Sequence, residues 1–290
     1  MNGVWPMIKM VKQYSGNRGF TTTVAHNDNV DYLKLAYFQA LNIKITQHSE
    51  NNYAIIADRK TIDRMEDKHQ EVFDVVVEMP GEWNFAREWE VRNLSPWKRT
   101  VKLDSDLFFV NDIANWWDSF EKWKILLTTQ VENYRGELIT NRWHRKLFDD
   151  NNMPDVYTAF YYWRDGVESA DFFTLCGEIS NNWDWFAKEF LIKNDKPQPR
   201  DDEIFSIAAA IYGVEHCTLP NGAFPRFVHF REALNDLPVG KPWNEQLHIE
   251  HNDELWIGHY PQRLPIHYIN KSFVTEELIA KYEQNYRKLF

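Results

Sequence analysis

Two aspartates at the end of an apolar segment are the residues of this chain best suited to chemistry. Asp104 and Asp106 follow Val101 and Leu103, which alternate with charged residues as in a β-strand, and a second apolar run covers residues 107–110. Two carboxylates one residue apart at a strand end point the same way and can share one divalent cation. Hard oxygen ligands suit Mg²⁺ or Mn²⁺, and such an ion would bridge the phosphates of a nucleoside diphosphate. A solvated turn is the alternative interpretation.

The first half of the chain alternates strand and helix signals. Strands are predicted over 19–25, 53–58, 72–77 and 99–104, and helices over 31–41, 61–69 and 82–94. This order implies a largely parallel sheet covered by helices on both faces. Ligands bind at the carboxyl ends of the strands in such sheets, which is where His26, Asp58 and Asp104 fall. Asp58 either contacts a ribose or base there or caps the helix that follows it.

The second half is less regular. Strands are predicted over 123–130 and 156–164, a helical region over 168–193, helices over 201–212 and 275–290, and loops with short strands over 221–252. The chain shows no repeat, no low-complexity segment and no flexible linker, so we expect one domain over residues 1–290.

Composition is that of an ordinary globular protein, with 43% apolar and 26% charged residues. Aromatic residues reach 16%, with 13 Trp, whose faces either stack on sugars and bases or fill the core. Cys176 and Cys217 are too few for a disulfide framework or a cysteine zinc site, which favours a reducing cytoplasm. Residues 1–14 lack a signal-peptide core, and no apolar run approaches about 18 residues, so no membrane partner is expected.

A net charge of −10 excludes a uniformly basic nucleic-acid face, though not a local one. One basic segment covers residues 141–146 and includes Arg142, Arg145 and Lys146, with Arg135 shortly before. It is either a solvated helix face or an acceptor surface that meets phosphates.

Four segments resemble the metal-dependent glycosyltransferases of GT-A fold, especially the group that includes bacterial galactosyltransferases and glycogenin. They are residues 25–33, Arg87 at 17 positions before Asp104, the Leu-Asp-Ser-Asp-Leu-Phe run at 103–108, and the His-Tyr element at 266–271. The resemblance implies an α/β fold with a single Rossmann-like, mostly parallel sheet flanked by helices. Residues of about 19–120 would form the nucleotide-binding half. Residues of about 121–290 would form the less regular acceptor half, which carries the late metal ligand.

The resemblance implies a metal site made by Asp104, Asp106 and His267. His259 competes with His267 for the third position, and a core histidine is the alternative for His267. An imidazole beside carboxylates suits Mn²⁺ better than Mg²⁺. The donor nucleotide, a UDP-sugar by resemblance, would contact strand-end and phosphate-binding residues, although Arg87 and Lys271 could equally form surface ion pairs. The implied donor-binding residues are Ala25, His26, Asn27, Asp58, Arg87, Ser105 and Lys271.

Three acids open the helix predicted over 201–212, and acids at a helix start are stabilised by its positive N-terminus. By resemblance, Asp202 occupies the position closest to the anomeric carbon, and Asp201 and Glu203 could bind sugar hydroxyls. A carboxylate here would be the general base of an inverting enzyme. In a retaining enzyme, towards which the resemblance leans, a phosphate oxygen would help to take the proton.

The implied activity is Mn²⁺-dependent hexosyl or pentosyl transfer from a nucleotide sugar to an acceptor hydroxyl. His26 and Asn27 replace the family's acidic pair. The family's Asn-Ser-Gly segment has at most residues 157–159 as its counterpart here. The sequence of residues 31–37 and the Trp116-Trp117 pair resemble glycosyltransferases of tailed bacteriophages. That implies DNA modification in the host cytoplasm, with hydroxymethylcytosine in double-stranded DNA as the acceptor, or else a saccharide.

Two other protein classes stay open. A nucleotidyltransferase would need a Gly-rich basic loop after the first strand, and residues 24–29 contain none. A non-enzymatic carbohydrate-binding or phage structural protein would use its Trp faces for sugars and the Asp-x-Asp as a calcium turn.

Overall fold

The central sheet is the frame on which every candidate residue is placed. The computed structural model describes residues 16–48, 50–81, 83–140, 143–191, 198–231, 234–237, 248–251 and 254–290. In this part of the chain six strands form one sheet in the order β3-β2-β1-β4-β7-β6. Their bounds are β1 Gly16–Val24, β2 Tyr53–Ala57, β3 Val75–Glu78, β4 Trp97–Leu103, β6 Ile125–Thr128 and β7 Tyr157–Arg164.

Strands β3, β2, β1 and β4 run parallel, whereas β7 is antiparallel to both β4 and β6. Parallel neighbours need crossover connections, and the predicted helical segments supply them. The connections are α1 (Tyr32–Thr46), α2 (Arg59–Ile62) with α3 (Asp67–Val72), and the 3₁₀ helix η1 (Phe85–Glu90) with α4 (Val91–Leu94). The largely parallel sheet is confirmed, while the helices predicted over 61–69 and 82–94 are each divided into two short pieces.

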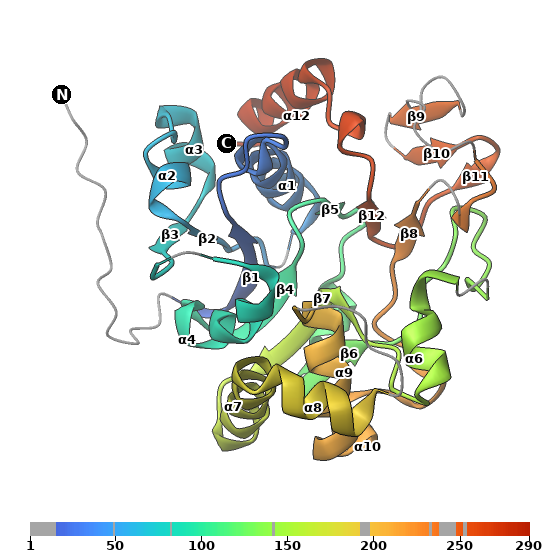
Figure 1. Cartoon of the computed structure of the whole chain (residues 1–290). Helices are drawn as coiled ribbons and strands as arrows, with labels where there is room; N and C mark the ends of the chain where they lie inside the picture. The colour runs from blue at the N-terminus through green and yellow to red at the C-terminus, as the bar shows by residue number, and fades with distance from the viewer. Residues whose placement is uncertain are drawn as a thin grey trace.

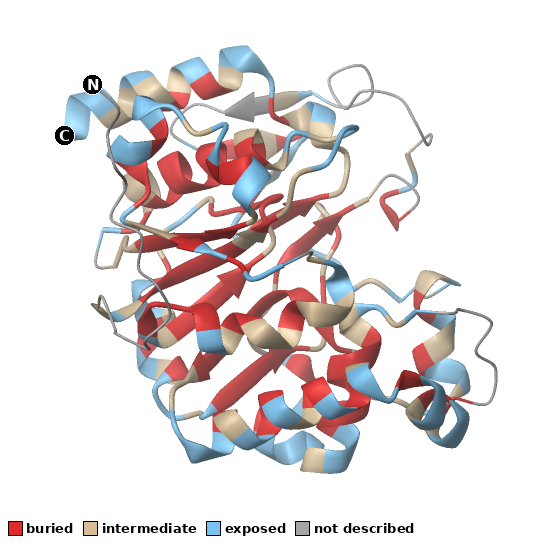
Figure 2. Cartoon of the chain, turned by 60° about the vertical axis from the view of Figure 1, so that its left-hand side comes forward, coloured by how far each residue is buried: buried red, intermediate tan, exposed pale blue. Residues whose placement is uncertain are grey.

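Alternate residues of each strand enter two separate cores, because successive side chains of a strand point to opposite faces. Ile55 and Leu126 pack on one face, and their neighbours Ile56 and Leu127 pack on the other. Most residues of the central strands are accordingly buried, while most of the flanking helices expose their outer sides (Figure 2).

Helices cover both faces of the sheet (Figure 1). One layer contains α1, α5 (Ala114–Phe120) and the terminal α12 (Glu276–Leu289), and the opposite layer contains α7 (Val167–Asn181), α8 (Trp183–Phe190), α9 (Asp201–Tyr212) and α10 (Val214–Cys217). The helix predicted over 201–212 matches α9. The helical region predicted over 168–193 divides between α7 and α8, and residues 192 and 193 lie outside the described part.

The strand order reverses beside β1, which is where ligands bind in open α/β sheets. The chain winds outward from β1 to β2 and β3, and then returns to β4 on the other side of β1. In the register of the sheet Thr22 pairs with Leu103, and Val24 pairs with Ala57. The residues that follow these strands, His26, Asp58 and Asp104, therefore lie at one edge, as predicted.

Two small sheets complete the described second half. One has the order β5-β12-β8, from Leu107–Phe108, Ile266–Tyr268 and Val228–Phe230; the other has the order β11-β10-β9, from Tyr260–Pro261, Leu255–Ile257 and Ile249–His251. The remaining short elements are η2 (Trp143–Arg145), α6 (Lys146–Asp150), η3 (Pro220–Gly222) and η5 (Lys271–Phe273). The first of these sheets joins the end of the chain to the segment that carries the aspartate pair.

Several tryptophans belong to the core rather than to a binding face. Trp97, Trp117 and Trp163 are at most 3% exposed, whereas Trp143 and Trp185 are exposed by 54% and 57%. Both cysteines are free and buried. Where the chain is described, no helix is both long enough and apolar enough to cross a membrane.

Candidate active site

A tight turn after β4 presents the two aspartates, and its backbone is held from two sides. The Asp104 N–H donates to the Ala159 carbonyl of β7 at 3.0 Å, and the Leu107 N–H closes the turn on the Asp104 carbonyl at 3.1 Å. Gln39 of α1, which is fully buried, donates its side-chain amide to the carbonyls of Asp104 and Leu107. The direction of the aspartates is therefore fixed by a strand and by a helix.

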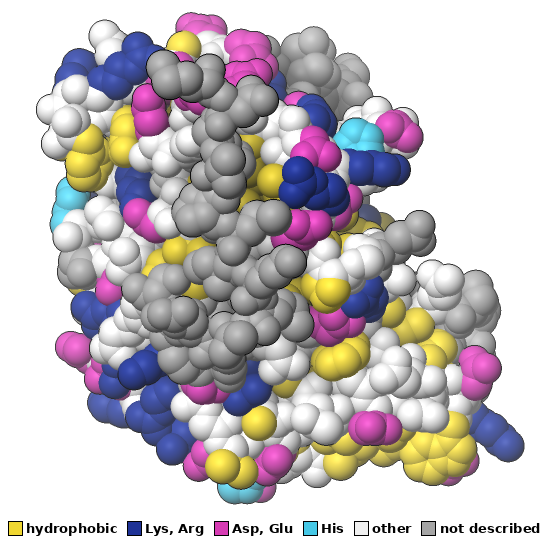
Figure 3. Space-filling model, turned by 90° about the vertical axis from the view of Figure 1, so that its left-hand side faces the viewer, with side chains coloured by type: hydrophobic (Ala, Val, Ile, Leu, Met, Phe, Trp, Pro, Cys, Tyr) yellow, Lys and Arg dark blue, Asp and Glu magenta, His cyan; other side chains and the backbone are white. Residues whose placement is uncertain are grey.

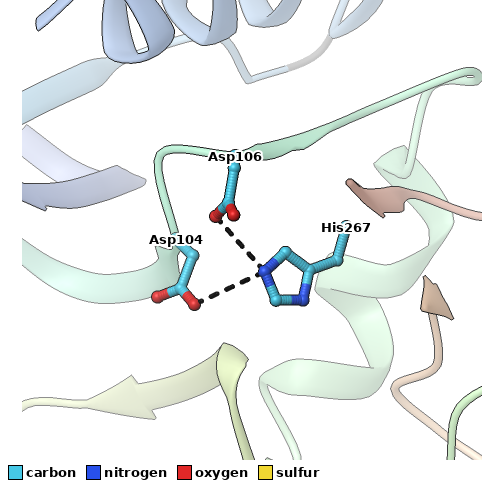
Figure 4. A group of neighbouring side chains, drawn as sticks. All are labelled: Asp104, Asp106 and His267. Carbon is cyan, nitrogen blue, oxygen red and sulfur yellow. Dashed lines mark ion pairs between the residues drawn. The ribbon is translucent and has the colours of Figure 1, made fainter. Parts of the chain in front are cut away.

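Strand β12 brings a histidine to the same turn. β12 pairs with β5 so that His267 lies opposite Leu107, and the Tyr268 N–H donates to the Asp106 carbonyl at 2.9 Å. His267 Nε2 lies 3.2 Å from Asp106 Oδ1 and 3.8 Å from Asp104 Oδ2 (Figure 4).

Among the described residues, Asp104, Asp106 and His267 form a group with the geometry of a metal site, each offering one ligand atom within 4.8 Å of the others. His259 is exposed in the turn between β10 and β11 and is not part of this group.

Each aspartate uses its second oxygen to bind a lysine. Lys102 Nζ lies 2.6 Å from Asp104 Oδ1, and Lys271 of η5 forms an ion pair with Asp106 Oδ2. The other two oxygens, Asp104 Oδ2 and Asp106 Oδ1, face His267 Nε2. Two carboxylate oxygens and one imidazole nitrogen are a donor set that fits Mn²⁺, with Mg²⁺ less well served by the nitrogen.

In the metal-free protein the opposite charges of these groups stabilise one another. Burial alone would raise the pKa of Asp106, but the His267 and Lys271 cations outweigh it and hold this pKa well below its usual range. Burial would lower the pKa of His267, but the Asp106 carboxylate outweighs it and raises this pKa. A proton on His267 Nε2 thus occupies the position that a cation would take, so metal binding must release it.

A buried ion pair lies behind Asp104. Lys102, which is 1% exposed, contacts Glu88 Oε1 at 2.7 Å as well as Asp104, and the Tyr161 hydroxyl donates to the same Glu88 oxygen at 3.0 Å. Sequence reasoning missed Lys102 and Glu88. The available signal was a lysine between Val101 and Leu103, in a strand that is otherwise apolar at this end.

The three acids of α9 have three different surroundings. Asp202 accepts hydrogen bonds from the Thr158 N–H at 2.9 Å and the Thr158 hydroxyl at 2.7 Å, and it forms an ion pair with Arg145. Burial would raise the pKa of Asp202, but Arg145 and Thr158 outweigh it, so this pKa is lowered. Both oxygens of Asp202 are therefore engaged by the protein.

Asp201 accepts the Asp202 N–H at 2.9 Å, and its charge is opposed by other carboxylates. Burial and the negative charges of Asp202 and Asp104 raise the pKa of Asp201 to about 8. Glu203 is 2% exposed and caps α9, because it accepts the Arg200 N–H at 3.0 Å. The capping interpretation thus describes Glu203, and Asp201 is the acid of this helix whose charge interacts with Asp104.

The loops after β1 and β2 are organised by the polar residues expected to bind the donor. Asp58 caps α2 by accepting the Thr61 N–H at 2.9 Å, and it also accepts the His26 N–H at 3.0 Å. The Asn27 side chain accepts the Asn29 N–H at 2.8 Å.

The other expected donor residues have mixed surroundings. Ala25 directly follows β1, and Ser105 is buried in the turn between the aspartates. Arg87 forms a bidentate ion pair with Glu90, with contacts of 2.6 Å and 2.7 Å. Of the two cations expected at the phosphates, Lys271 lies at the aspartate pair, whereas Arg87 has a carboxylate partner of its own.

The described part of the basic segment 141–146 is divided, because Arg145 is buried whereas Lys146 is exposed. Asn141 and Arg142 lie outside the described residues, and Arg145 is 4% exposed, with its guanidinium bound to Asp155 and Asp202. Both interpretations of the segment, a solvated face or a phosphate-binding surface, are wrong for Arg145, because two buried carboxylates draw it inward. On the face shown in Figure 3, cationic and anionic side chains are mixed rather than separated.

A cavity of about 250 Å³ opens between the end of β6 and the start of β7. Its lining combines polar and apolar side chains: Thr129, Gln130, Val131, Leu138, Ile139, Thr140, Asp155 and Tyr157. Asp155 binds Arg145, which binds Asp202, so a short chain of ion pairs connects the cavity to the start of α9.

No protein-family model matches this sequence, and no curated protein does. Solved structures match its fold. The galactosyltransferase LgtC, solved with donor and acceptor sugar analogs, is 10% identical and has a TM-score of 0.51 over 93% of this chain and 95% of its own. The bifunctional glycosyltransferase WbbM is 11% identical, with a TM-score of 0.52 over 97% of this chain and 51% of its own. The glycosyltransferase GlyE of Streptococcus pneumoniae is 11% identical, with a TM-score of 0.46 over 93% of this chain and 61% of its own.

This chain thus spans about half the length of WbbM, and nearly all of LgtC. At identities of 10% and 11% the similarity establishes the fold. The chain has the GT-A fold of glycosyltransferases, as its sequence predicted.

Proposed function

We propose that this protein is a metal-dependent glycosyltransferase that moves a sugar from a nucleoside diphosphate sugar to an acceptor hydroxyl. The observation that carries the proposal is the convergence of Asp104, Asp106 and His267 at the switch point of a GT-A sheet. An acidic pair, a histidine and a lysine together form a site for a cation and the two phosphates beside it.

The metal is proposed to be Mn²⁺, with Mg²⁺ as the weaker alternative. When bound, it would act as a Lewis acid that neutralises negative charge on the departing diphosphate. Lys271, held beside Asp106, supplies a second positive charge for the same phosphates. The loop after β1 and the end of β2 are the proposed seat of the nucleoside, and a UDP-sugar is the proposed donor.

Asp201 is the α9 acid that we propose to contact the transferred sugar or its acceptor hydroxyl. Burial and neighbouring carboxylates raise its pKa to about 8, so this carboxyl can donate a hydrogen bond to a sugar oxygen when protonated and accept one from a hydroxyl when ionised. Asp202 is proposed to position β7 through Thr158, since both of its oxygens are already engaged. Glu203 is proposed to act only as a helix cap.

A saccharide is the acceptor that we favour. The cavity beside β7 is large enough for about one sugar ring, and its hydroxyl, amide and carboxylate groups can bind sugar hydroxyls. Hydroxymethylcytosine in duplex DNA, the other acceptor expected from the sequence, loses one of the cations expected at its phosphates, because Arg145 is buried in ion pairs.

The test of the proposed function combines binding with transfer. Thermal unfolding is measured with a panel of nucleoside diphosphates, each with and without Mn²⁺, because ligands that bind the native state raise the melting temperature. The nucleotide that raises it in a Mn²⁺-dependent way names the donor base. Sugar transfer from that donor is then assayed for the wild type and for Asp104→Asn, which should fold normally and lose transfer.

Asp118→Asn is the matched control, because it removes the same charge from an exposed position of α5. It should keep full activity. Full activity of Asp104→Asn would refute the metal assignment. No response to any nucleotide, together with sugar binding, would favour the carbohydrate-binding alternative.

A further inference from the structure

A second histidine lies directly behind the proposed metal ligand. Strand β8 pairs in parallel with β12, and in that register His229 is the partner of His267. Residues paired across neighbouring strands project to the same face of the sheet, so the two imidazoles meet. Their Nδ1 atoms lie 3.3 Å apart, and both side chains are buried, at 6% and 7% exposure.

The two nitrogens of His267 have opposite environments. Nε2 faces Asp104 and Asp106, and the other ring nitrogen points away from them (Figure 4). A histidine that binds a cation through Nε2 needs its lone pair there, so its proton must sit on Nδ1. The Nδ1–H then needs an acceptor, and His229 Nδ1 lies within reach.

We propose that His229 is a positioning residue that accepts the Nδ1–H of His267 and thereby fixes the tautomer and ring angle of the metal ligand. This inference rests on the proposed metal site and adds to it a residue that contacts the ligand His267 rather than the metal. His229 then carries its own proton on Nε2 whenever the metal is bound.

Three neighbouring rings hold His229 in this orientation. His144 of η2 stacks on it with ring centroids 6.0 Å apart and an interplanar angle of 14°. The ring of Tyr157 is tilted against it and that of Phe227 is edge-on, with centroid distances of 6.0 Å and 6.1 Å. The backbone is fixed as well, because the His229 N–H donates to the Glu132 carbonyl at 2.8 Å. A ring packed on several sides presents its Nδ1 in one direction, which is what an orienting acceptor requires.

The test compares two replacements of nearly equal shape. The side-chain oxygen of Asn lies where Nδ1 of His lies, and Leu has the same branching without an acceptor. Mn²⁺ affinity is measured directly by electron paramagnetic resonance of the free ion. We expect His229→Leu to weaken Mn²⁺ binding about 10- to 100-fold and His229→Asn to restore most of the loss.

Phe227→Leu is the packing control, because Phe227 contacts the His267 ring at 5.7 Å without any acceptor atom. Equal losses of affinity in Phe227→Leu and His229→Leu, or wild-type affinity in His229→Leu, would overturn the role of His229. A wild type that binds no Mn²⁺ would overturn the metal site and the inference with it. Wild-type binding with an unaffected Leu variant overturns the inference alone.

A measurement on the wild type avoids variants that fail to fold. Side-chain ¹⁵N shifts of histidine in the Mg²⁺-loaded protein report which ring nitrogen carries the proton. We expect His267 to be protonated at Nδ1 and His229 at Nε2. Finding the His229 proton on Nδ1 would contradict the proposal, because that nitrogen could no longer accept.

Discussion

Lys102 is a buried ammonium between two carboxylates, and it binds one oxygen of Asp104. Burial would lower the pKa of Lys102, but Asp104 and Glu88 outweigh it and raise this pKa. Burial raises the pKa of Glu88, and Lys102 offsets part of that rise. A buried pair of this kind is costly to break, because one partner is left as an uncompensated charge.

Replacing Lys102 by Met should therefore destabilise the protein by about 3–5 kcal/mol. Chemical unfolding at pH 7 measures the loss. The double variant Lys102→Met with Glu88→Gln should recover part of it, because the orphaned charge is removed. A Lys102→Met protein as stable as the wild type would contradict the coupling of these side chains.

The raised pKa of Asp201 predicts how the stability of the metal-free protein depends on pH. Its pKa is raised from 3.8 to about 8 by burial and by neighbouring carboxylates. Between these values the folded protein keeps a proton that the unfolded chain releases, so the free energy of unfolding falls as pH rises from about 4 to about 8.

The variant Asp201→Asn cannot titrate, and its stability relative to the wild type should increase across this window. Unfolding curves at pH 5, 7 and 9 measure the difference, with the exposed Asp118→Asn as the control. Parallel pH profiles for wild type and Asp201→Asn would contradict the prediction.

At the scale of elements, α1 both completes the core and fixes the aspartate turn. Its residues from Leu35 to Ile43 are buried without interruption, because the sheet lies on one side and α12 on the other, where Phe38 packs against Tyr282 with centroids 4.9 Å apart. Its polar residues Gln39 and Asn42 bind the backbone of β5, of the turn before it and of Phe109 after it. Asn42 accepts the Phe109 N–H at 2.7 Å and donates to the Phe109 carbonyl at 2.8 Å.

Asn42→Ala should cost about 2–4 kcal/mol, because it leaves a buried N–H and a buried carbonyl of Phe109 without partners. Thermal and chemical unfolding measure the loss. Asn181→Ala, at an exposed position of α7, should stay within about 0.5 kcal/mol of the wild type. Similar small effects for both variants would show that α1 does not stabilise the segment after β5 through Asn42.

At the scale of the whole molecule, the site joins distant parts of the chain. Lys271 and Asp106 are 165 positions apart in sequence, and both belong to the same site. A cation bound there would tie the end of β4 to β12.

Mn²⁺ should therefore raise the free energy of unfolding by about 2.7 kcal/mol at one hundred times its dissociation constant. It should also slow amide hydrogen exchange in β12 and β8, in addition to the turn after β4. Hydrogen exchange with Mn²⁺ and after chelation measures both effects. Asp106→Asn should abolish them, and protection confined to the turn would argue against His267 as a ligand.

Much of the fold was readable from the sequence, because its signals are local. Short apolar and β-branched runs predicted the strands, helical spacing predicted α1, α9 and α12, and their alternation predicted a mostly parallel sheet. The aspartate pair follows an apolar strand directly, so its place at the ligand edge was also predictable. His267 was identified only through the resemblance of its segment to a known family.

Only the tertiary structure decided which groups meet. The alignment of distant segments decides whether Arg145 faces solvent or Asp202. It also decides which acid of α9 interacts with Asp104, and it places His229 behind His267. Lys102 and Glu88 are likewise joined only when η1 packs beside β4. Local sequence sets the direction of each side chain along its own strand or helix. Its partner across the fold is set by strand register and helix packing, which depend on the whole chain.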